Sequence, residues 1–222
     1  MKKQVLTCSL VLFFCCFVAS GTVLTFQSHP SSTNTATDMV FSDVGPVIPI
    51  PPNPAWYTPA GTTWVSPWQS GDPSAPGFYS PVNGTTVIFS HMFEIPLNFL
   101  VMSATLQVLA DDTTSGWLNG NILFPPGSGS APHCVANPPG CVLSTLWTGN
   151  VTTNLFHSGM NTLQLPTEQL NGQSFGANWV LEVNGEYRQP EVPEPGTVYL
   201  FAGGVLFLFG IRRWRFLRFF QD

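Results

Sequence analysis

The feature that most constrains the fold is a series of short segments in which apolar and polar residues alternate. In the segment 102–110, Ala104, Leu106, Val108 and Ala110 would share one face of a strand. Asn-Gly pairs, which favour tight turns, separate several of these segments. No convincing helical periodicity appears before the apolar run near the C-terminus. The sequence therefore predicts an all-β sandwich, with candidate strands at Thr85–Ile95, Phe99–Ala110, Gly116–Leu123, Cys141–Trp147, Gly159–Pro166 and Ala177–Tyr187.

The segment before these strands carries little fold signal. Residues 22–61 are rich in Ser, Thr and Pro, and prolines favour extended backbone. We interpret this segment as an extended edge piece or a linker that leads into a β-sandwich domain at 62–190.

Charge is distributed very unevenly along the chain. Between residues 22 and 192, ten acidic residues stand against one basic residue, Arg188. A nucleic-acid binder needs surface Lys and Arg to displace counterions from phosphates. The middle of the chain is therefore not expected to bind nucleic acid, and its acidic, lysine-free surface suits neutral glycans or divalent cations.

The N-terminus has the composition of a signal peptide. Lys2 and Lys3 precede an apolar run from Val5 to Val18, and the small residues Ala19 and Ser20 follow it. This order is typical of a cleaved export signal, which we place at residues 1–21. An uncleaved N-terminal anchor is the alternative interpretation.

The C-terminus, residues 191–222, has three features in a fixed order. A Pro-Glu-Pro motif (Pro193, Glu194 and Pro195) precedes an apolar segment, expected to form a short transmembrane helix over about 197–211. An arginine cluster follows and would hold that end in the cytoplasm; its members are Arg212, Arg213, Arg215 and Arg218. A plain C-terminal anchor is the alternative.

This tail resembles the PEP-CTERM sorting signal of proteins exported by Gram-negative bacteria. The resemblance covers about the last 30 residues. It implies that a membrane-embedded exosortase recognises and processes the tail. It also implies a destination at the cell surface or in an extracellular polysaccharide matrix.

Three short strings in the middle of the chain resemble a second pattern. They are Ala110-Asp111-Asp112, Leu118-Asn119-Gly120 and Gly159-Met160-Asn161-Thr162-Leu163. Together they resemble the galactose-binding-domain-like jelly roll, over roughly residues 62–187. The resemblance implies a jelly-roll-like sandwich, although any β-sandwich with ordinary hairpin turns would also explain the strings.

The cysteines agree with export. Cys134 and Cys141 are the pair that would remain after signal cleavage, and an even pair in an oxidising compartment predicts one disulfide. A metal site that includes the adjacent His133 is the alternative, but it lacks the paired spacing of structural zinc.

The acidic pair Asp111 and Asp112 is the one local cluster of carboxylates. With Asn119, Asn121 or Glu94 it would supply hard oxygen ligands to a structural Ca²⁺. The alternatives are a solvated corner whose carboxylates cap backbone N–H groups and, more remotely, a hydrolase acid pair.

Aromatic residues are plentiful, and exposed ones stack on sugar rings. Trp179 alternates with Leu181 and Val183, which predicts a core position. The candidates for a surface platform that binds glycans lie mostly in Gly/Pro/Ser-rich sequence; they are Trp64, Trp68, Tyr79 and Trp117.

No catalytic constellation is apparent. The histidines are scattered, none has i, i+4 ligand spacing or a paired acid nearby, and no Gly-x-Ser-x-Gly elbow occurs. We therefore predict a non-enzymatic exported protein, without a cofactor other than structural Ca²⁺, that associates with extracellular polysaccharide. A purely structural or adhesive coat protein is the alternative, with a secreted hydrolase and an ice-binding protein as weaker ones.

Overall fold

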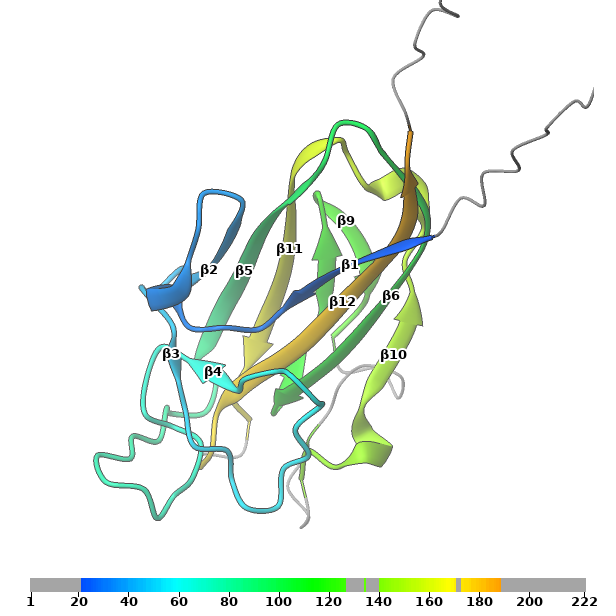
Figure 1. The fold of residues 1–222 in the computed structure, drawn as a ribbon. Coiled ribbons are helices and arrows are strands. Elements are labelled where there is room, and N and C mark those ends of the chain that lie inside the picture. The colour runs from blue at the N-terminus through cyan, green and yellow to red at the C-terminus, as the bar shows by residue number, and fades with distance from the viewer. Residues whose placement is uncertain (1–20, 127–133, 135–139, 171–172, 189–222) are drawn as a thin grey trace, which may run out of the picture. The chain divides into compact units, whose positions relative to one another are not determined.

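A computed structural model describes residues 21–126, 134, 140–170 and 173–188, which build two antiparallel β-sheets (Figure 1). The first sheet has the strand order β10-β6-β12-β4-β3, and β1 also pairs with β12. Its strands are β1 (Thr22–Gln27), β3 (Ile48–Pro49), β4 (Val65–Ser66), β6 (Phe99–Asp111), β10 (Trp147–Asn150) and β12 (Gly176–Tyr187).

The second sheet has the order β2-β5-β11-β8-β9, and β7 pairs with β11. Its strands are β2 (Asp38–Ser42), β5 (Thr86–Ile95), β7 (Thr113–Thr114), β8 (Gly116–Leu118), β9 (Asn121–Phe124) and β11 (Gly159–Glu168). The short 3₁₀ helices η1 (Ser31–Thr33), η2 (Leu143–Thr145) and η3 (Thr153–Leu155) lie in connections. The predicted all-β sandwich is confirmed.

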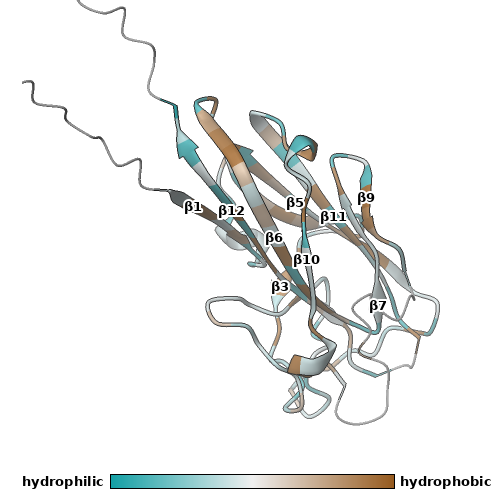
Figure 2. Ribbon diagram, turned by 90° about the vertical axis from the view of Figure 1, so that its right-hand side faces the viewer, coloured by the Kyte–Doolittle hydropathy of each residue, from teal (hydrophilic) through white to brown (hydrophobic). Residues whose placement is uncertain are grey.

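The main core lies between the two sheets, and the alternation in the sequence places its side chains. All four alternating residues of the segment 102–110 are buried, as are Trp179, Leu181 and Val183 of β12. Opposite them lie Phe89 and Phe93 of β5. Figure 2 shows apolar and polar positions alternating along the long strands. Each large apolar side chain buried here contributes roughly 1.5–3 kcal/mol to folding.

A second, smaller core covers part of the outer face of the first sheet. The segment between β3 and β4 folds back over that face and brings tryptophans onto it. The members of this second core are Ile50, Trp56, Trp64, Leu109, Cys134 and Cys141, with Leu146 packed against them. The disulfide between Cys134 and Cys141 is confirmed, with their Cα atoms 4.5 Å apart.

The disulfide should stabilise this second core measurably. Replacing both Cys134 and Cys141 by Ser is expected to lower the free energy of unfolding by about 2 kcal/mol, because the short closed loop no longer restricts the unfolded chain. Urea unfolding of the oxidised wild type and of the double variant would measure this. An equal midpoint for the two would contradict it.

Three local expectations from the sequence need correction. Of the two interpretations of residues 22–61, an extended edge piece or a linker, the linker is wrong, because β1 pairs with β12, β2 pairs with β5, and Phe26 and Val40 enter the main core. Residues Cys141–Trp147 do not form a strand; η2 occupies the middle of that segment and β10 begins only at Trp147. The predicted strand Gly116–Leu123 is a hairpin, β8 and β9, that turns at Asn119-Gly120.

The structure does not describe the two predicted sorting segments at the ends of the chain. The segments outside the described residues include 1–20, 189–222 and the stretch that contains His133. The first holds almost all of the expected signal peptide. The second holds the Pro-Glu-Pro motif, the apolar segment and the arginine cluster. In the part of the chain that the structure describes, no helix is long and apolar enough to cross a membrane.

Candidate functional site

The structure separates the four aromatic candidates for a glycan platform. The prediction that Trp64 lies on the surface is wrong, because only 1% of the residue is exposed. Its ring centroid lies 4.2 Å from that of Trp56, and its indole N–H donates to the Tyr57 carbonyl. Its Gly/Pro/Ser-rich segment resembles a surface loop but builds the second core. Trp64 therefore cannot stack on a sugar from the surface.

Trp68 and Tyr79 come together in the connection between β4 and β5. Their ring centroids lie 5.5 Å apart, Trp68 packs on the buried Phe175, and Tyr79 is half exposed. The pair offers one exposed phenol ring that is backed by an indole. It is a small platform, which stays a candidate for contact with a sugar.

Trp117 occupies a more extended surface, the outer face of the second sheet. Cross-strand pairing aligns one residue from each of five strands in a row, and we call this row the Trp117 row. Its members, from β2 to β9, are Phe41, Ser90, Gln164, Trp117 and Ile122. Directly opposed residues point to the same face, and Leu118 and Leu163 on either side point into the core.

The Trp117 row carries no charge, and its apolar members are at least a third exposed, whereas Ser90 is buried. Phe41, Trp117 and Ile122 are 37%, 36% and 53% exposed, and the Trp117 indole N–H donates to Ser115 Oγ over 3.2 Å, which orients the ring. A neighbouring row, Met39, Met92 and Thr162, is also uncharged. From Phe41 to Trp117 is three strand spacings, about 14 Å, long enough for several contacts along an extended chain molecule.

Asp111 and Asp112 lie at a buried corner, where the chain passes from β6 in the first sheet to β7 in the second. Neither is more than 7% exposed, so the corner is not solvated as the alternative interpretation expected. Asp112 does cap backbone, because its Oδ2 accepts the Leu170 N–H at 2.6 Å. Their burial differs from the open cleft in which a glycosidase acid pair works.

The co-ligands expected for Ca²⁺ from the sequence are wrong. Asn119 lies beside Thr162 of β11 and Glu94 pairs with Met160, whereas the backbone N–H of Asp112 donates to the Glu168 carbonyl. Thr162 and Glu168 are six residues apart on one strand, about 20 Å. Asn119 and its neighbour Asn121 therefore belong to the opposite end of the sandwich.

Burial dominates the electrostatics of the acidic corner. It raises the pKa of Asp111 to about 10, and the hydrogen bond and negative charge of Asp112 act in the same direction. Two carboxylates in contact cannot both stay charged in a desolvated site unless a cation lies with them.

A polar cluster that the sequence did not reveal joins three elements at one edge of the sandwich. Both His91 Nε2 on β5 and His29 Nε2, just after β1, bond Asp38 Oδ1 on β2, at 2.5 and 3.1 Å. The three side chains are separated by up to 62 positions in the sequence, so the acid near each histidine was invisible. One signal existed: His91 sits in the apolar alternation of β5, between Phe89 and Phe93, and a buried histidine needs partners.

Two histidines and a carboxylate are a common ligand set for transition metals, but the hydrogen bonds around His91 disfavour a metal. Trp179 Nε1 lies 2.9 Å from His91 Nδ1, and an indole nitrogen is only a donor. His91 Nδ1 must therefore accept, and its proton sits on Nε2, facing Asp38. A metal-bound imidazole usually donates its second N–H instead. The cluster is thus a hydrogen-bonded clasp, which we call the Asp38 clasp.

The clasp shifts the pKa of two of its members. Burial lowers the pKa of His91 below the ordinary 6.5, and this outweighs the opposite effect of the Asp38 carboxylate. Burial alone would raise the pKa of Asp38, but its hydrogen bonds and attraction to His91 and His29 lower it below 3.8. At neutral pH the clasp therefore joins a charged carboxylate to an uncharged His91.

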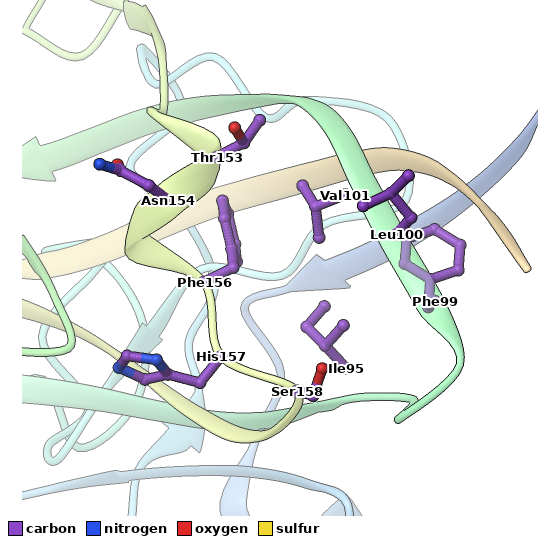
Figure 3. A pocket seen from close by; sticks show the side chains of 9 residues that line it. All are labelled: Ile95, Phe99, Leu100, Val101, Thr153, Asn154, Phe156, His157 and Ser158. Atoms are coloured by element: carbon purple, nitrogen blue, oxygen red, sulfur yellow. The ribbon is translucent and has the colours of Figure 1, made fainter. Parts of the chain in front are cut away.

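A pocket of about 270 Å³ opens at the end of the sandwich near η3 (Figure 3). Apolar side chains such as Phe99, Val101 and Phe156 line much of it, and Asn154 and His157 add polar groups. None of its lining residues is acidic and none of the sequence-predicted site residues lies in it. It offers room for a small ligand but no acid–base pair for hydrolysis.

The described residues thus offer three candidate features for function: the exposed Trp117 row, the Trp68–Tyr79 pair and the buried acidic corner. The Asp38 clasp stabilises the edge that carries β2. No protein-family model matches the chain, and no curated protein is significantly similar to it.

Proposed function

We propose that this chain is an exported, non-enzymatic surface or matrix protein that is sorted through its C-terminal tail and binds extracellular polysaccharide. Export is supported by the order of Lys2 and Lys3, the apolar run and small residues at the N-terminus. The Pro-Glu-Pro motif, apolar segment and arginine cluster support an exosortase-type enzyme as the processing partner. The disulfide agrees with an oxidising destination.

We further propose that the sandwich is a jelly roll of the galactose-binding-like type. The three strings that resemble this type each lie where the chain turns or where a strand begins or ends. Ala110-Asp111-Asp112 ends β6, Leu118-Asn119-Gly120 makes the β8–β9 turn, and Gly159–Asn161 begins β11. Asn161 also accepts the His157 N–H and donates to the His157 and Gly159 carbonyls, which fixes the entry into β11.

The Trp117 row carries the proposal of glycan binding. Trp117 presents an indole face for the C–H groups of a sugar ring, and beside it the Gln164 amide can donate to and accept from hydroxyl groups. The row holds no charge, and the domain around it is strongly acidic. A neutral polysaccharide fits this surface, because an anionic one would be repelled.

Co-sedimentation of the full chain with the neutral extracellular polysaccharide of its host tests this function. Trp117→Ala is expected to weaken binding about tenfold, as loss of one aromatic stacking contact of about 1.4 kcal/mol predicts. Trp68→Ala, in the other aromatic pair, is the matched control and should bind like the wild type. Binding that survives Trp117→Ala but fails in Trp68→Ala or Tyr79→Ala would overturn the assignment to the Trp117 row.

A structural coat protein is the second candidate, and the edge strand β9 favours it. Ile122 is exposed at the end of the Trp117 row, and among the described strands β9 pairs with β8 alone. An exposed apolar edge strand readily pairs with another chain. Concentration-dependent self-association that Ile122→Lys abolishes, without any polysaccharide binding by the wild type, would replace the glycan proposal with this one.

A further inference from the structure

Asn178 is a buried amide without a hydrogen-bond partner. It is 0% exposed, and neither its Oδ1 nor its Nδ2 is paired in the structure. Asn161, which is equally buried, makes hydrogen bonds through both atoms of its amide, to His157, Gly159 and Asn119. Buried polar side chains are paired in the great majority of cases, and the described residues give Asn178 no such partner.

The sheet register directs Asn178 toward the acidic corner. Asn178 pairs directly with Leu109, and Asp111 pairs with the next residue on the same face of β12, Gly176. Asp111 lies two residues after Leu109 and therefore points to the same face as Leu109 and Asn178. The Cβ atoms of such a diagonal pair are about 7 Å apart, so their oxygen atoms reach toward a shared point between the two strands.

Two apolar side chains and one carbonyl lie over Gly176, the residue that pairs with Asp111. A Cβ added to Gly176 would meet Ile50 Cδ1 at 2.8 Å, the Val65 carbonyl oxygen at 3.1 Å and Trp64 Cε3 at 3.6 Å. The Asp112 carboxylate bonds that of Asp111 from the adjacent position, and both residues are buried. Thr113 Oγ1, the next side chain along, is also buried and unpaired. The site thus brings the carboxyl groups of Asp111 and Asp112 near two other oxygen atoms, Asn178 Oδ1 and Thr113 Oγ1, which are buried and unpaired.

We propose that Asp111, Asp112 and Asn178 bind a divalent cation of the hard class, Ca²⁺, with the Thr113 hydroxyl as a further oxygen ligand. Ca²⁺ takes oxygen ligands at 2.3–2.6 Å in flexible geometry, which suits the spacing of the diagonal pair. Zn²⁺ is disfavoured, because the nearest soft ligands, Cys134 and Cys141, are bonded to each other. The cation would tie β6 and β12 to the crossing into β7. This proposal does not depend on glycan binding.

Calcium titration of the chelator-treated full chain tests the site. We expect one Ca²⁺ bound per chain by calorimetry, and a melting temperature about 5–10 °C higher at one hundred times the dissociation constant than in EDTA. Tb³⁺, which replaces Ca²⁺, should show luminescence on tryptophan excitation, because Trp64 covers the site. Added Ca²⁺ should displace Tb³⁺ and quench this signal.

Matched variants locate the ligands. Asp111→Asn keeps the shape of the side chain but removes its charge, and it should weaken Ca²⁺ binding at least tenfold; Asn178→Ala should weaken it about fivefold. Glu94→Gln, an acid at the opposite end of the sandwich, should bind Ca²⁺ like the wild type. The proposal is overturned if the wild type binds no Ca²⁺ at millimolar concentration. It is equally overturned if Asn178→Ala, whose folding circular dichroism can verify, binds as tightly as the wild type.

Discussion

Replacing Trp64 by Ala is expected to lower the free energy of unfolding by about 3–5 kcal/mol, the usual cost of truncating a fully buried large aromatic. The indole of Trp64 fills the centre of the second core, stacks on Trp56 and donates to the Tyr57 carbonyl. Its loss would leave a cavity over β12 and an unpaired carbonyl. Urea denaturation followed by circular dichroism, with linear extrapolation, measures the change.

Trp117→Ala is the matched control, because it removes the same side chain from a surface. About a third of Trp117 is exposed on the outer face of the second sheet. The free energy of unfolding of Trp117→Ala should be no more than about 1 kcal/mol below that of the wild type. Under conditions in which Trp64→Ala is folded, that variant should bind glycan like the wild type. Equal destabilisation by the two substitutions would contradict the division into a core tryptophan and a surface tryptophan.

The contrast between these tryptophans shows which part of the fold can be predicted from sequence. Alternation predicted β5, β6, β11 and β12 to within about two residues, because a half-buried strand needs an apolar face at every second position. Trp64 has no such pattern around it. Its burial depends on a Pro-rich segment that folds back over the first sheet, and nothing local in the sequence indicates that contact.

The errors have the same origin. The Ser, Thr and Pro content of residues 22–61 as a whole concealed the strand-forming segment Thr22–Gln27, which becomes β1 and is held by six residue pairs with β12. At Cys141–Trp147 the apolar residues favoured a strand. Instead the Thr145 hydroxyl accepts the Val142 N–H and donates to the Val142 carbonyl, which closes a turn of 3₁₀ helix.

A candidate site residue could be predicted from the sequence only where its own type suggests the function, as a tryptophan suggests sugar stacking and an acid pair suggests cation binding. Trp117 and the Asp111–Asp112 pair could be named from the sequence. Asn178 could not, because an asparagine in a strand gives no sign that its partners are missing. The Asp38 clasp could not either, since it depends on the pairing of β2 with β5 and on the loop after β1.

Stability should fall as the pH is lowered from 7.5, because of the Asp38 clasp. The folded chain keeps His91 uncharged well below 6.5, whereas the unfolded chain protonates it near 6.5. Between those two pKa values the unfolded state binds one more proton, so the stability contributed by neutral His91 is lost as pH falls. Asp38 adds a loss below pH 3.8, as its carboxylate is protonated first in the unfolded state. One proton contributes up to about 1.4 kcal/mol per pH unit.

Two variants separate this mechanism from general acid sensitivity. His91→Gln removes the titrating ring but keeps an amide donor for Asp38 and an acceptor for Trp179, so it should flatten the fall in stability just below pH 6.5. Trp179→Phe removes the indole N–H that faces His91 Nδ1 over 2.9 Å, so His91 can take up a proton and the slope should shrink as well. The clasp also contains His29, and the phenyl rings of Phe26 and Phe93, which carry no charge, pack against His91. Urea midpoints at pH 7.5, 6.5, 5.5 and 4.5 supply the slopes. If both variants keep the wild-type slope, the acid sensitivity does not come from His91 and its hydrogen bond with Trp179, and its source lies outside the clasp.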